Sequence, residues 1–310
     1  MFKYIKFFLL VVSFILILAI LILKYKGKTD KIRVCEVTRS LFYAPQYVAI
    51  SEGFFSEQGL NIEITTGGGS DKVMAAVLSG HIDIGLAGPE SCIYVNDQGY
   101  KDKIKIFAQL TKKDAFFLIS KYPIKNFKFK DLIGCTIIAG RKGGMPYISL
   151  VQILRKNNIE PGRDVTLDTS VNPEIAHTSF INGRAEFATL LEPTASTVVK
   201  QEKGYFATSM AEHCSEIPYT VYFAKESYII NNPKIIKKFT NAIASAQKWV
   251  YSNTAEQTAL SISKFFPNID FDLLVSCIKK YKDAKNWSDT PDVNEESLNK
   301  LKNLIATLPH

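Results

Sequence analysis

The most constraining feature of the sequence is a repeated alternation of short β-rich runs with helical patterns over its first two thirds. Such alternation is typical of parallel sheets that are covered by helices. It predicts an α/β fold. The predicted strands are residues 32–38, 61–65, 82–87, 103–110, 116–120, 136–139, 165–168, 185–191 and 219–224, and the predicted helices between them are residues 45–53, 71–79 and 146–157.

The last third of the chain is almost wholly helical in pattern. Its predicted helices are residues 233–252, 255–265, 271–282 and 295–308. We therefore expect this part to pack around the strands. A chain of 310 residues with 46% hydrophobic and 22% charged residues can bury a large core, either as one large domain or as two α/β lobes.

An internal echo favours two lobes. Residues 79–85 (SGHIDIG) resemble residues 182–188 (NGRAEFA): each has a helix end, a glycine and then a strand that opens with an acid. Glycine after a helix end is a C-cap signal. Since the copies lie about a hundred residues apart, we expect one such unit in each of two similar lobes.

Each copy runs into a proline beside a glutamate. The first continues as Gly88-Pro89-Glu90 and the second as Glu192-Pro193. In open α/β sheets, ligands bind beyond the carboxyl ends of the strands. Two facing lobes would thus form a cleft edged by Glu90 and Glu192. The alternative is that both acids are solvated residues at helix N-termini.

A first glycine-rich turn precedes a predicted helix at Gly68, Gly69 and Ser70. It could present backbone N–H groups to polar atoms of a ligand. It lacks the lysine and hydroxyl spacing of a nucleotide-hydrolysing phosphate loop and the GxGxxG of dinucleotide sites. A plain tight turn is the alternative.

A second glycine loop follows the predicted strand 136–139. It contains Arg141, Lys142, Gly143 and Gly144 and opens a helix that has proline in its first turn. Its amides, helix dipole and two cations would suit an anion or a carbonyl-bearing ring. The alternative is a solvated loop whose charges face water.

Four aromatic side chains are further candidates for contact with a ligand. Phe42 and Tyr43 come directly after the first predicted strand, where a planar ligand could stack, and Tyr147 and Tyr219 are the others. Burial in the core is the alternative for each.

Composition excludes several other functions. Of the net charge of +8, the first 31 residues contribute +5, and no basic run with interleaved aromatics follows, so we expect no nucleic-acid partner. The five cysteines and four histidines are widely spaced and show no metal-ligand or nucleophile signature. We therefore expect no catalytic residues, no metal and no cofactor, and cysteines that are mostly small buried hydrophobes.

The N-terminus has the pattern of a signal or transmembrane segment. Residues 7–23 are apolar except for Ser13, and lysines flank them on both sides. No small-residue cleavage site closes the run and no lipid-accepting cysteine follows it. An uncleaved membrane anchor is therefore predicted.

The chain after this segment resembles a known family. Residues 43–60 (YAPQYVAISEGFFSEQGL), the glycine-rich turn, residues 78–85 (LSGHIDIG) and Glu192-Pro193 are similar to solute-binding proteins that serve thiamine-pyrimidine, alkanesulfonate, taurine and nitrate transporters. A yeast pyrimidine-precursor synthase belongs to the same family. The resemblance covers essentially everything after the predicted anchor.

The resemblance implies a type II periplasmic-binding-protein fold with ligand between two lobes that close on it. It places residues 31–112 and 221–310 in lobe 1 and residues 113–220 in lobe 2, after an N-terminal segment of residues 1–30. The two connections between the lobes are expected near residues 110–116 and 218–223. The implied partners are a small solute and the permease and ATPase subunits of an ABC importer, at the extracytoplasmic face of the membrane, and we expect a monomer.

The resemblance also suggests a ligand. In the thiamine-pyrimidine members an aromatic residue stacks on the ring and a glutamate near a proline in the second lobe bonds its amino group; Phe42 or Tyr43 and Glu192 match these places. A thiamine-related pyrimidine or similar heterocycle is favoured, because a carboxylate disfavours a sulfonate in a desolvated cleft. Alkanesulfonate, taurine or another small anion is the alternative, supported by Arg141 and Lys142. The synthase lacks support, since its cysteine-rich motif has no counterpart here.

Overall fold

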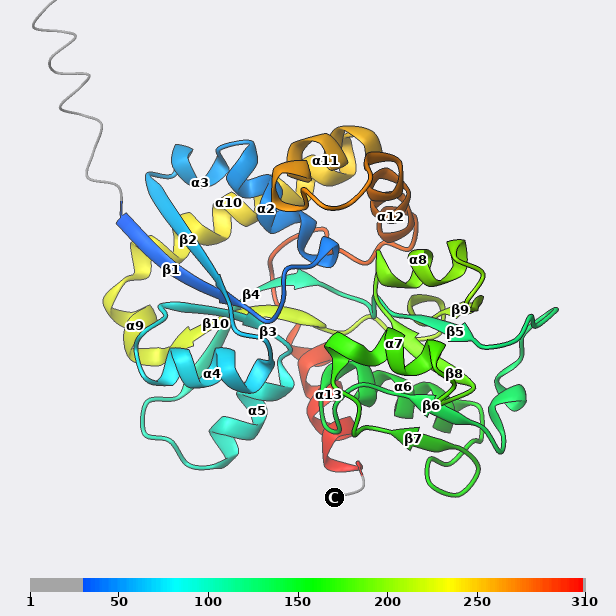
Figure 1. The fold of residues 1–310 in the computed structure, drawn as a ribbon. Helices are drawn as coiled ribbons and strands as arrows, with labels where there is room; N and C mark the ends of the chain where they lie inside the picture. The colour runs from blue at the N-terminus through cyan, green and yellow to red at the C-terminus, as the bar shows by residue number, and fades with distance from the viewer. Residues whose placement is uncertain (1–29, 309–310) are drawn as a thin grey trace, which may run out of the picture.

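Two five-stranded sheets organise residues 30–308, the part of the chain that the computed structural model describes (Figure 1). The first sheet has the order β2-β1-β3-β10-β4 and the second has the order β7-β6-β8-β5-β9. The strands of the first sheet are β1 (Asp30–Glu36), β2 (Leu60–Thr66), β3 (Ile84–Ala87), β4 (Ile104–Thr111) and β10 (Thr220–Lys225). Those of the second are β5 (Phe117–Ser120), β6 (Thr136–Ile138), β7 (Thr166–Asp168), β8 (Phe187–Leu190) and β9 (Tyr205–Ser209).

The two sheets repeat one connectivity. β1 lies parallel to β2 and β3, and β6 lies parallel to β7 and β8. An antiparallel strand then follows in each sheet, β10 beside β3 and β5 beside β8. The prediction of two similar α/β lobes is therefore confirmed. We call the first sheet with its covering helices lobe 1, and the second sheet with its helices lobe 2.

The echoed segments occupy equivalent places in the two lobes. Gly80 and Gly183 both have positive φ, +79° and +82°, and each ends a helix ahead of the central strand of its sheet. The acid that opens each strand then holds the neighbouring strand. Asp83 accepts a hydrogen bond from the backbone N–H of Arg33 in β1 at 2.9 Å, and Glu186 accepts one from Thr136 in β6 at 2.8 Å.

Helices cover both sheets, and most of those over lobe 1 come from the ends of the described chain. In lobe 1 they are η1 (Leu41–Tyr43), α2 (Ala44–Ser51), α3 (Phe54–Glu57), α4 (Ser70–Leu78), α5 (Glu90–Asp97), α9 (Glu226–Asn231), α10 (Pro233–Ser252), α11 (Ala255–Ile262), η5 (Ser263–Phe265) and α12 (Phe271–Asp283). In lobe 2 they are η2 (Phe129–Leu132), α6 (Met145–Lys156), η3 (Pro173–Ile175), α7 (Ala176–Ile181), α8 (Thr194–Lys200) and η4 (Met210–Glu212).

The long helix α10 shows why the last third packs as predicted. Its buried residues recur at helical spacing on one face, which contacts α2 and α3. They are Phe239, Ala242, Ile243, Ala246, Gln247 and Val250. Helix α11 also contacts α2, and α12 packs on α11, so these three helices extend lobe 1.

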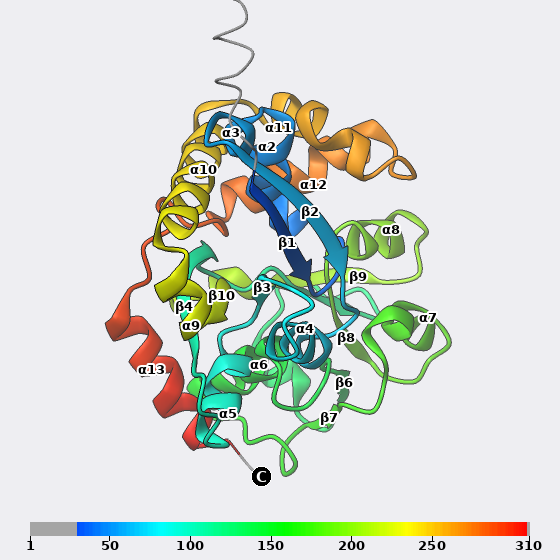
Figure 2. The same ribbon diagram turned by 90° about the vertical axis from the view of Figure 1, so that its left-hand side faces the viewer.

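The last helix, α13 (Glu295–Ala306), contacts both lobes. It packs against α5 of lobe 1 and α6 of lobe 2, and just beyond it the carbonyl of Thr307 accepts a hydrogen bond from Arg155 of α6 at 3.0 Å. Figure 2 shows α13 at the edge of the molecule opposite to α7 and α8. The two connections between the sheets, residues 112–116 and 210–219, join β4 to β5 and β9 to β10.

The predicted element boundaries agree with the structure to within a few residues. The prediction omitted the edge strand β9 and gave no bounds for the short helices α3, α5, α7, α8 and α9. β9 was not predicted because it lacks the apolar run of a buried strand. It lies at the edge of its sheet and exposes Tyr205 and Phe206.

The predicted membrane segment, residues 7–23, lies outside the described residues. Within residues 30–308, no helix has the length and apolar character needed to cross a membrane.

The strand-opening acids give a stability prediction. Asp83 accepts hydrogen bonds from the backbone N–H, Nε and Nη2 of Arg33, at 2.9, 3.0 and 2.7 Å, whereas the more exposed Glu186 accepts one from Thr136. We expect Asp83→Ala to lower the free energy of unfolding by about 1–3 kcal/mol and Glu186→Ala by less than about 1 kcal/mol. Urea unfolding of the two variants measures the difference, and equal losses would contradict the assigned roles.

Candidate functional site

The two lobes meet where their strands end. In lobe 1, β3 leads through Pro89 into α5, and in lobe 2, β6 leads through Gly144 into α6. Polar contacts join these ends across the junction. Tyr94 Oη donates to the carbonyl of Gly143 at 3.0 Å, so the lobes are in contact in this structure. The candidate site is this junction, which is where the sequence predicted a cleft.

Glu90 is a buried acid at the junction. It stands in the first turn of α5, is only 3% exposed, and its Oε2 is buried with no hydrogen-bond partner. A Cβ at Gly88 would lie 1.9 Å from that oxygen, so the carboxylate folds back over the preceding loop. The alternative reading of Glu90 as a solvated residue is wrong, because α6 and the aromatic side chains of the junction exclude water from it.

Burial controls the ionisation of Glu90. It raises the pKa of this carboxyl to about 7, and the backbone amides of Glu90 and of Met145 in the first turn of α6 offset the effect only in part. An ionised carboxylate with a free oxygen is among the costliest groups to bury. A bound molecule that donated a hydrogen bond to Oε2 would remove that cost.

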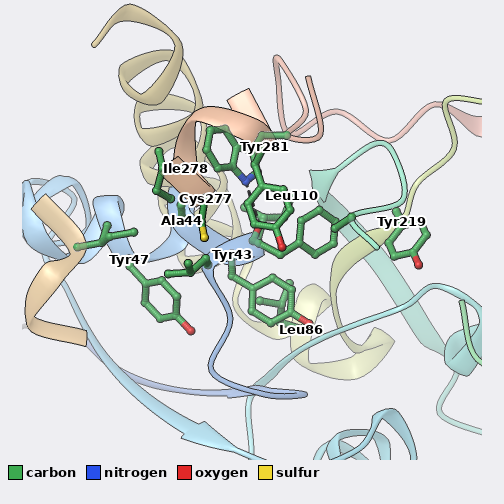
Figure 3. Close-up of a cluster of buried hydrophobic side chains, with 14 of the residues drawn as sticks. Tyr43, Ala44, Tyr47, Leu86, Leu110, Tyr219, Cys277, Ile278 and Tyr281 are labelled. Atoms are coloured by element: carbon green, nitrogen blue, oxygen red, sulfur yellow. Dashed lines mark hydrogen bonds between the residues drawn. The ribbon is translucent and has the colours of Figure 1, made fainter. Parts of the chain in front are cut away.

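Three of the predicted aromatic residues, Phe42, Tyr43 and Tyr219, gather beside Glu90. Phe42 packs edge-on against Tyr219 with ring centroids 5.8 Å apart, and it lies 5.8 Å from Tyr281 of α12. Figure 3 shows Tyr43, Tyr219 and Tyr281 in one cluster of buried side chains. Burial raises the pKa of Tyr43 and Tyr219, and the charge of Glu90 contributes to the rise at both. All four rings are buried. In this closed arrangement these aromatic residues therefore belong to the core, which was the alternative to contact with a ligand.

A buried acid that the sequence reasoning missed lies in the first connection between the lobes. Asp114 accepts hydrogen bonds from Tyr219 Oη at 3.0 Å and from the backbone N–H of Phe116 at 2.7 Å. Burial raises its pKa to about 6. Because Lys112 and Lys113 precede it, the segment resembles an exposed polar loop, and no sequence signal marks the acid.

A second missed acid is Glu36, the last residue of β1. Its carboxylate is fully buried and accepts hydrogen bonds from Gln46 Nε2 at 2.8 Å and from Tyr47 Oη at 2.7 Å. Tyr222 of β10 donates in turn to Gln46 Oε1 at 3.0 Å. The sequence signal that could have identified Glu36 is its position, since it is an acidic residue at the carboxyl end of a strand. The network fixes the start of α2 relative to the sheet.

Glu192 is buried, and both its carboxylate and its backbone N–H have hydrogen-bond partners. Its carboxylate accepts hydrogen bonds from Lys280 Nζ of α12 at 2.6 Å, from Ser196 Oγ at 2.8 Å and from the backbone N–H of Ser196 at 3.0 Å. Its own N–H donates to Tyr281 Oη at 3.1 Å. The alternative of a solvated acid is therefore wrong for Glu192 as well, because α12 covers it.

The glycine-rich turns face each other at the rim. Arg141 Nη1 lies 3.1 Å from Asp71 Oδ1, in the first turn of α4, and 2.7 Å from the position that a Cβ on Gly69 would occupy. Gly68 has a φ of +75° and donates its N–H to the carbonyl of Val37. Beside them Ser70 begins α4.

The side chain of Lys142 is exposed. This agrees with the alternative that its charge faces water. Arg141 keeps 45% of its side chain exposed in its pair with Asp71. These cations therefore stand at the edge of the junction.

The charges of the junction have a clear arrangement. Four of its acids are buried, at 3% exposure or less, whereas three of its cations keep 31% or more of their side chains exposed. The acids are Glu36, Glu90, Asp114 and Glu192, and the cations are Arg39, Arg141 and Lys280. The interior thus favours a ligand that brings N–H donors or positive charge.

The cysteines give no sign of redox or metal chemistry between residues 30 and 308. All five are free, and Cys35, Cys92 and Cys277 are buried as predicted, while Cys135 and Cys214 are partly exposed. The described residues contain no cluster of three or more potential metal-ligating side chains.

The sequence is similar to that of known proteins. Residues 42–257 match the family model described as NMT1/THI5 like. The chain is 38% identical over 293 residues to the Bacillus subtilis (strain 168) protein named "Putative binding protein YtlA", a match that covers 94% of this chain and 88% of that protein.

Solved structures show the same fold. The periplasmic aliphatic sulphonate binding protein SsuA from Escherichia coli superposes with a TM-score of 0.72 at 17% identity, over 89% of this chain and 91% of that one. The periplasmic nitrate-binding protein NrtA from Synechocystis PCC 6803 superposes with a TM-score of 0.67 at 18% identity, over 81% and 70%. The predicted periplasmic-binding-protein fold is therefore confirmed.

The pKa of Glu90 gives a pH prediction. Because burial raises this pKa from 4.5 to about 7, the folded chain binds the proton more tightly than the unfolded chain does. Ionisation of Glu90 therefore costs stability as the pH rises from about 4.5 to 7. We expect Glu90→Gln to be more stable than the parent at pH 8, by up to about 3 kcal/mol, at about 1.4 kcal/mol for each pKa unit.

The difference should shrink toward zero as the pH falls to about 4.5. Thermal unfolding of both proteins between pH 4.5 and pH 8 measures it. A constant difference across this range would show that the carboxyl of Glu90 does not titrate with a raised pKa.

Proposed function

Since the chain belongs to the NMT1/THI5-like family, we propose that it captures a small solute between its lobes and delivers it to the permease of an ABC-type importer. The binding-protein fold and the similarity to a named binding protein support this role. The function is one of binding and release, with no catalytic step.

Capture would proceed by closure of the two lobes. The ends of β3 and β6 approach each other only when the lobes are together, so a solute held between them favours the closed form. The proposed moving bodies are residues 31–112 with 221–310, and residues 113–220. The two connections at residues 112–116 and 210–219 would carry the hinge motion.

The free carboxylate oxygen of Glu90 carries the proposal for the ligand. A solute with N–H groups could donate to Oε2, and a flat ring could pack on the neighbouring Phe42 and Tyr43 when the lobes open and reclose. We propose an aminopyrimidine related to thiamine, or a similar heterocycle. The deficit of buried positive charge around Glu90 disfavours a sulfonate.

A small anion is the second candidate. Arg141 lies at the mouth of the junction, and both glycine-rich turns open helices whose N-termini attract negative charge. SsuA and NrtA are named for sulphonate and nitrate. For this ligand class Arg141 would have to exchange Asp71 for the solute.

The location follows from the proposed role. A solute receptor of this type works outside the cytoplasmic membrane, where residues 7–23 would anchor it. Its proposed partners are the solute and the permease and ATPase subunits, and it would act as a monomer.

A thermal-shift panel on the full chain in detergent tests the ligand class. The panel contains aminopyrimidines, taurine, an alkanesulfonate and nitrate. A ligand at 100 times its dissociation constant adds about 2.7 kcal/mol to stability. We expect stabilisation by an aminopyrimidine, and we expect Glu90→Gln to weaken that binding by about 1–3 kcal/mol.

Asp97→Asn, at the exposed end of the same helix α5, is the matched control and should bind like the parent. Stabilisation by a sulfonate or nitrate alone would move the solute to Arg141 and the glycine-rich turns. Absence of any shift across the panel would count against the whole set of proposed solutes.

A further inference from the structure

Helix α12 reaches from lobe 1 to lobe 2 through a lysine. Its Lys280 Nζ lies 2.6 Å from Glu192 Oε1 and 2.6 Å from Ser196 Oγ, and both of these atoms belong to the segment that follows β8. Figures 1 and 2 both place α12 next to α8. This ion pair therefore spans the two lobes, and Glu90 takes no part in it.

Aromatic rings of lobe 2 hold the lysine in position. Lys280 Nζ lies 4.2 Å from the ring centroid of Phe206 in β9 and 5.4 Å from that of Phe117 in β5. A cation over an aromatic face is attracted by the ring. Lys280 is thus directed at lobe 2 by three kinds of contact: a carboxylate, a hydroxyl and two rings.

The next residue along α12 adds a second contact between the lobes. Tyr281 Oη accepts a hydrogen bond from the backbone N–H of Glu192 at 3.1 Å. Its ring is fully buried and lies 5.8 Å from Phe42 and 6.4 Å from Trp287, both in the part of the chain that packs with lobe 1. The tyrosine therefore packs with lobe 1, and it contacts lobe 2 through its hydroxyl and through its ring, which lies 6.5 Å from that of Phe117 in β5.

These contacts exist only while the lobes are together. On opening, Glu192 and Lys280 would separate and return to water, so their interaction distinguishes the closed form from the open one. The Glu192 carboxylate is fully enclosed in the closed form. Removal of Lys280 alone would leave a buried, unpaired charge in that form, and the closed form would lose population.

From these contacts we infer that Lys280, Glu192 and Tyr281 form an interlobe latch that stabilises the closed form. The latch also takes up the carboxylate of Glu192, which leaves Glu90 as the buried acid that is free to face a solute. The inference rests on the proposed function, since a solute receptor of this kind must close its two lobes around the solute. Its test needs no solute.

Hydrogen exchange on the full chain in detergent reports the latch directly. The amide of Glu192 donates across the junction, so its exchange follows opening of the lobes. We expect Lys280→Met to speed exchange in a peptide that contains Glu192 by at least about fivefold, the lower end of ordinary coupling between sites. Lys279→Met is the matched control, because Lys279 pairs with Asp283 on the exposed face of α12.

A double variant separates a latch from a loss of packing. Lys280→Met combined with Glu192→Gln leaves no unpaired buried charge, so we expect exchange closer to the parent than in Lys280→Met alone. Two results would overturn the inference: equal exchange in Lys280→Met and Lys279→Met, or a double variant at least as fast as Lys280→Met.

The test is independent of the solute. If no compound stabilises the protein but Lys280→Met opens it, the ligand assignment fails and the latch stands. If an aminopyrimidine binds and Lys280→Met leaves exchange unchanged, the receptor function stands and the latch fails. In a receptor with both properties, Lys280→Met also weakens solute binding, since fewer molecules are in the closed form.

Discussion

Four carboxylates are buried at or beside the junction of the two lobes, and most of them have hydrogen-bond partners there. Glu36 is satisfied within lobe 1 by Gln46 and Tyr47, and Asp114 by Tyr219 at the connection between the lobes. Glu192 is satisfied by Lys280 of α12. Glu90 alone keeps a buried oxygen without a partner. An unpaired buried acid is expensive, so this difference among four similar groups marks the position at which a ligand would contribute most.

The repeated connectivity of the two sheets explains why the acids meet. Each lobe places the carboxyl ends of its parallel strands at one edge, and the edges face each other because two short connections join the sheets at their antiparallel strands. The echoed acids Asp83 and Glu186 hold the opposite ends of the same strands. In each of the two similar segments, the acid before the strand therefore fixes the sheet, and the residues after the strand form the candidate site.

The sequence predicted every strand except β9, the two lobes, and Glu90 and the aromatic residues as candidates at strand ends, because these follow from local periodicity and from the rule that ligands bind at strand ends. It did not predict the partner of Glu192. Lys280 lies 88 residues further along the chain, on a helix with three lysines that the sequence alone does not distinguish. The burial of Asp114 was not predicted for a similar reason, since it depends on Tyr219, 105 residues away.

The latch and the unpaired acid act in opposite directions on closure. The pair of Lys280 with Glu192 favours the closed form, whereas the burial of ionised Glu90 opposes it. A receptor with the first alone would close empty, and one with the second alone would close poorly even on its solute. In the proposed receptor, which has both, the free energy of closing would stay small until a donor reached Glu90 Oε2 and removed the opposing cost. The proposed solute would then decide the conformation by satisfying a single carboxylate.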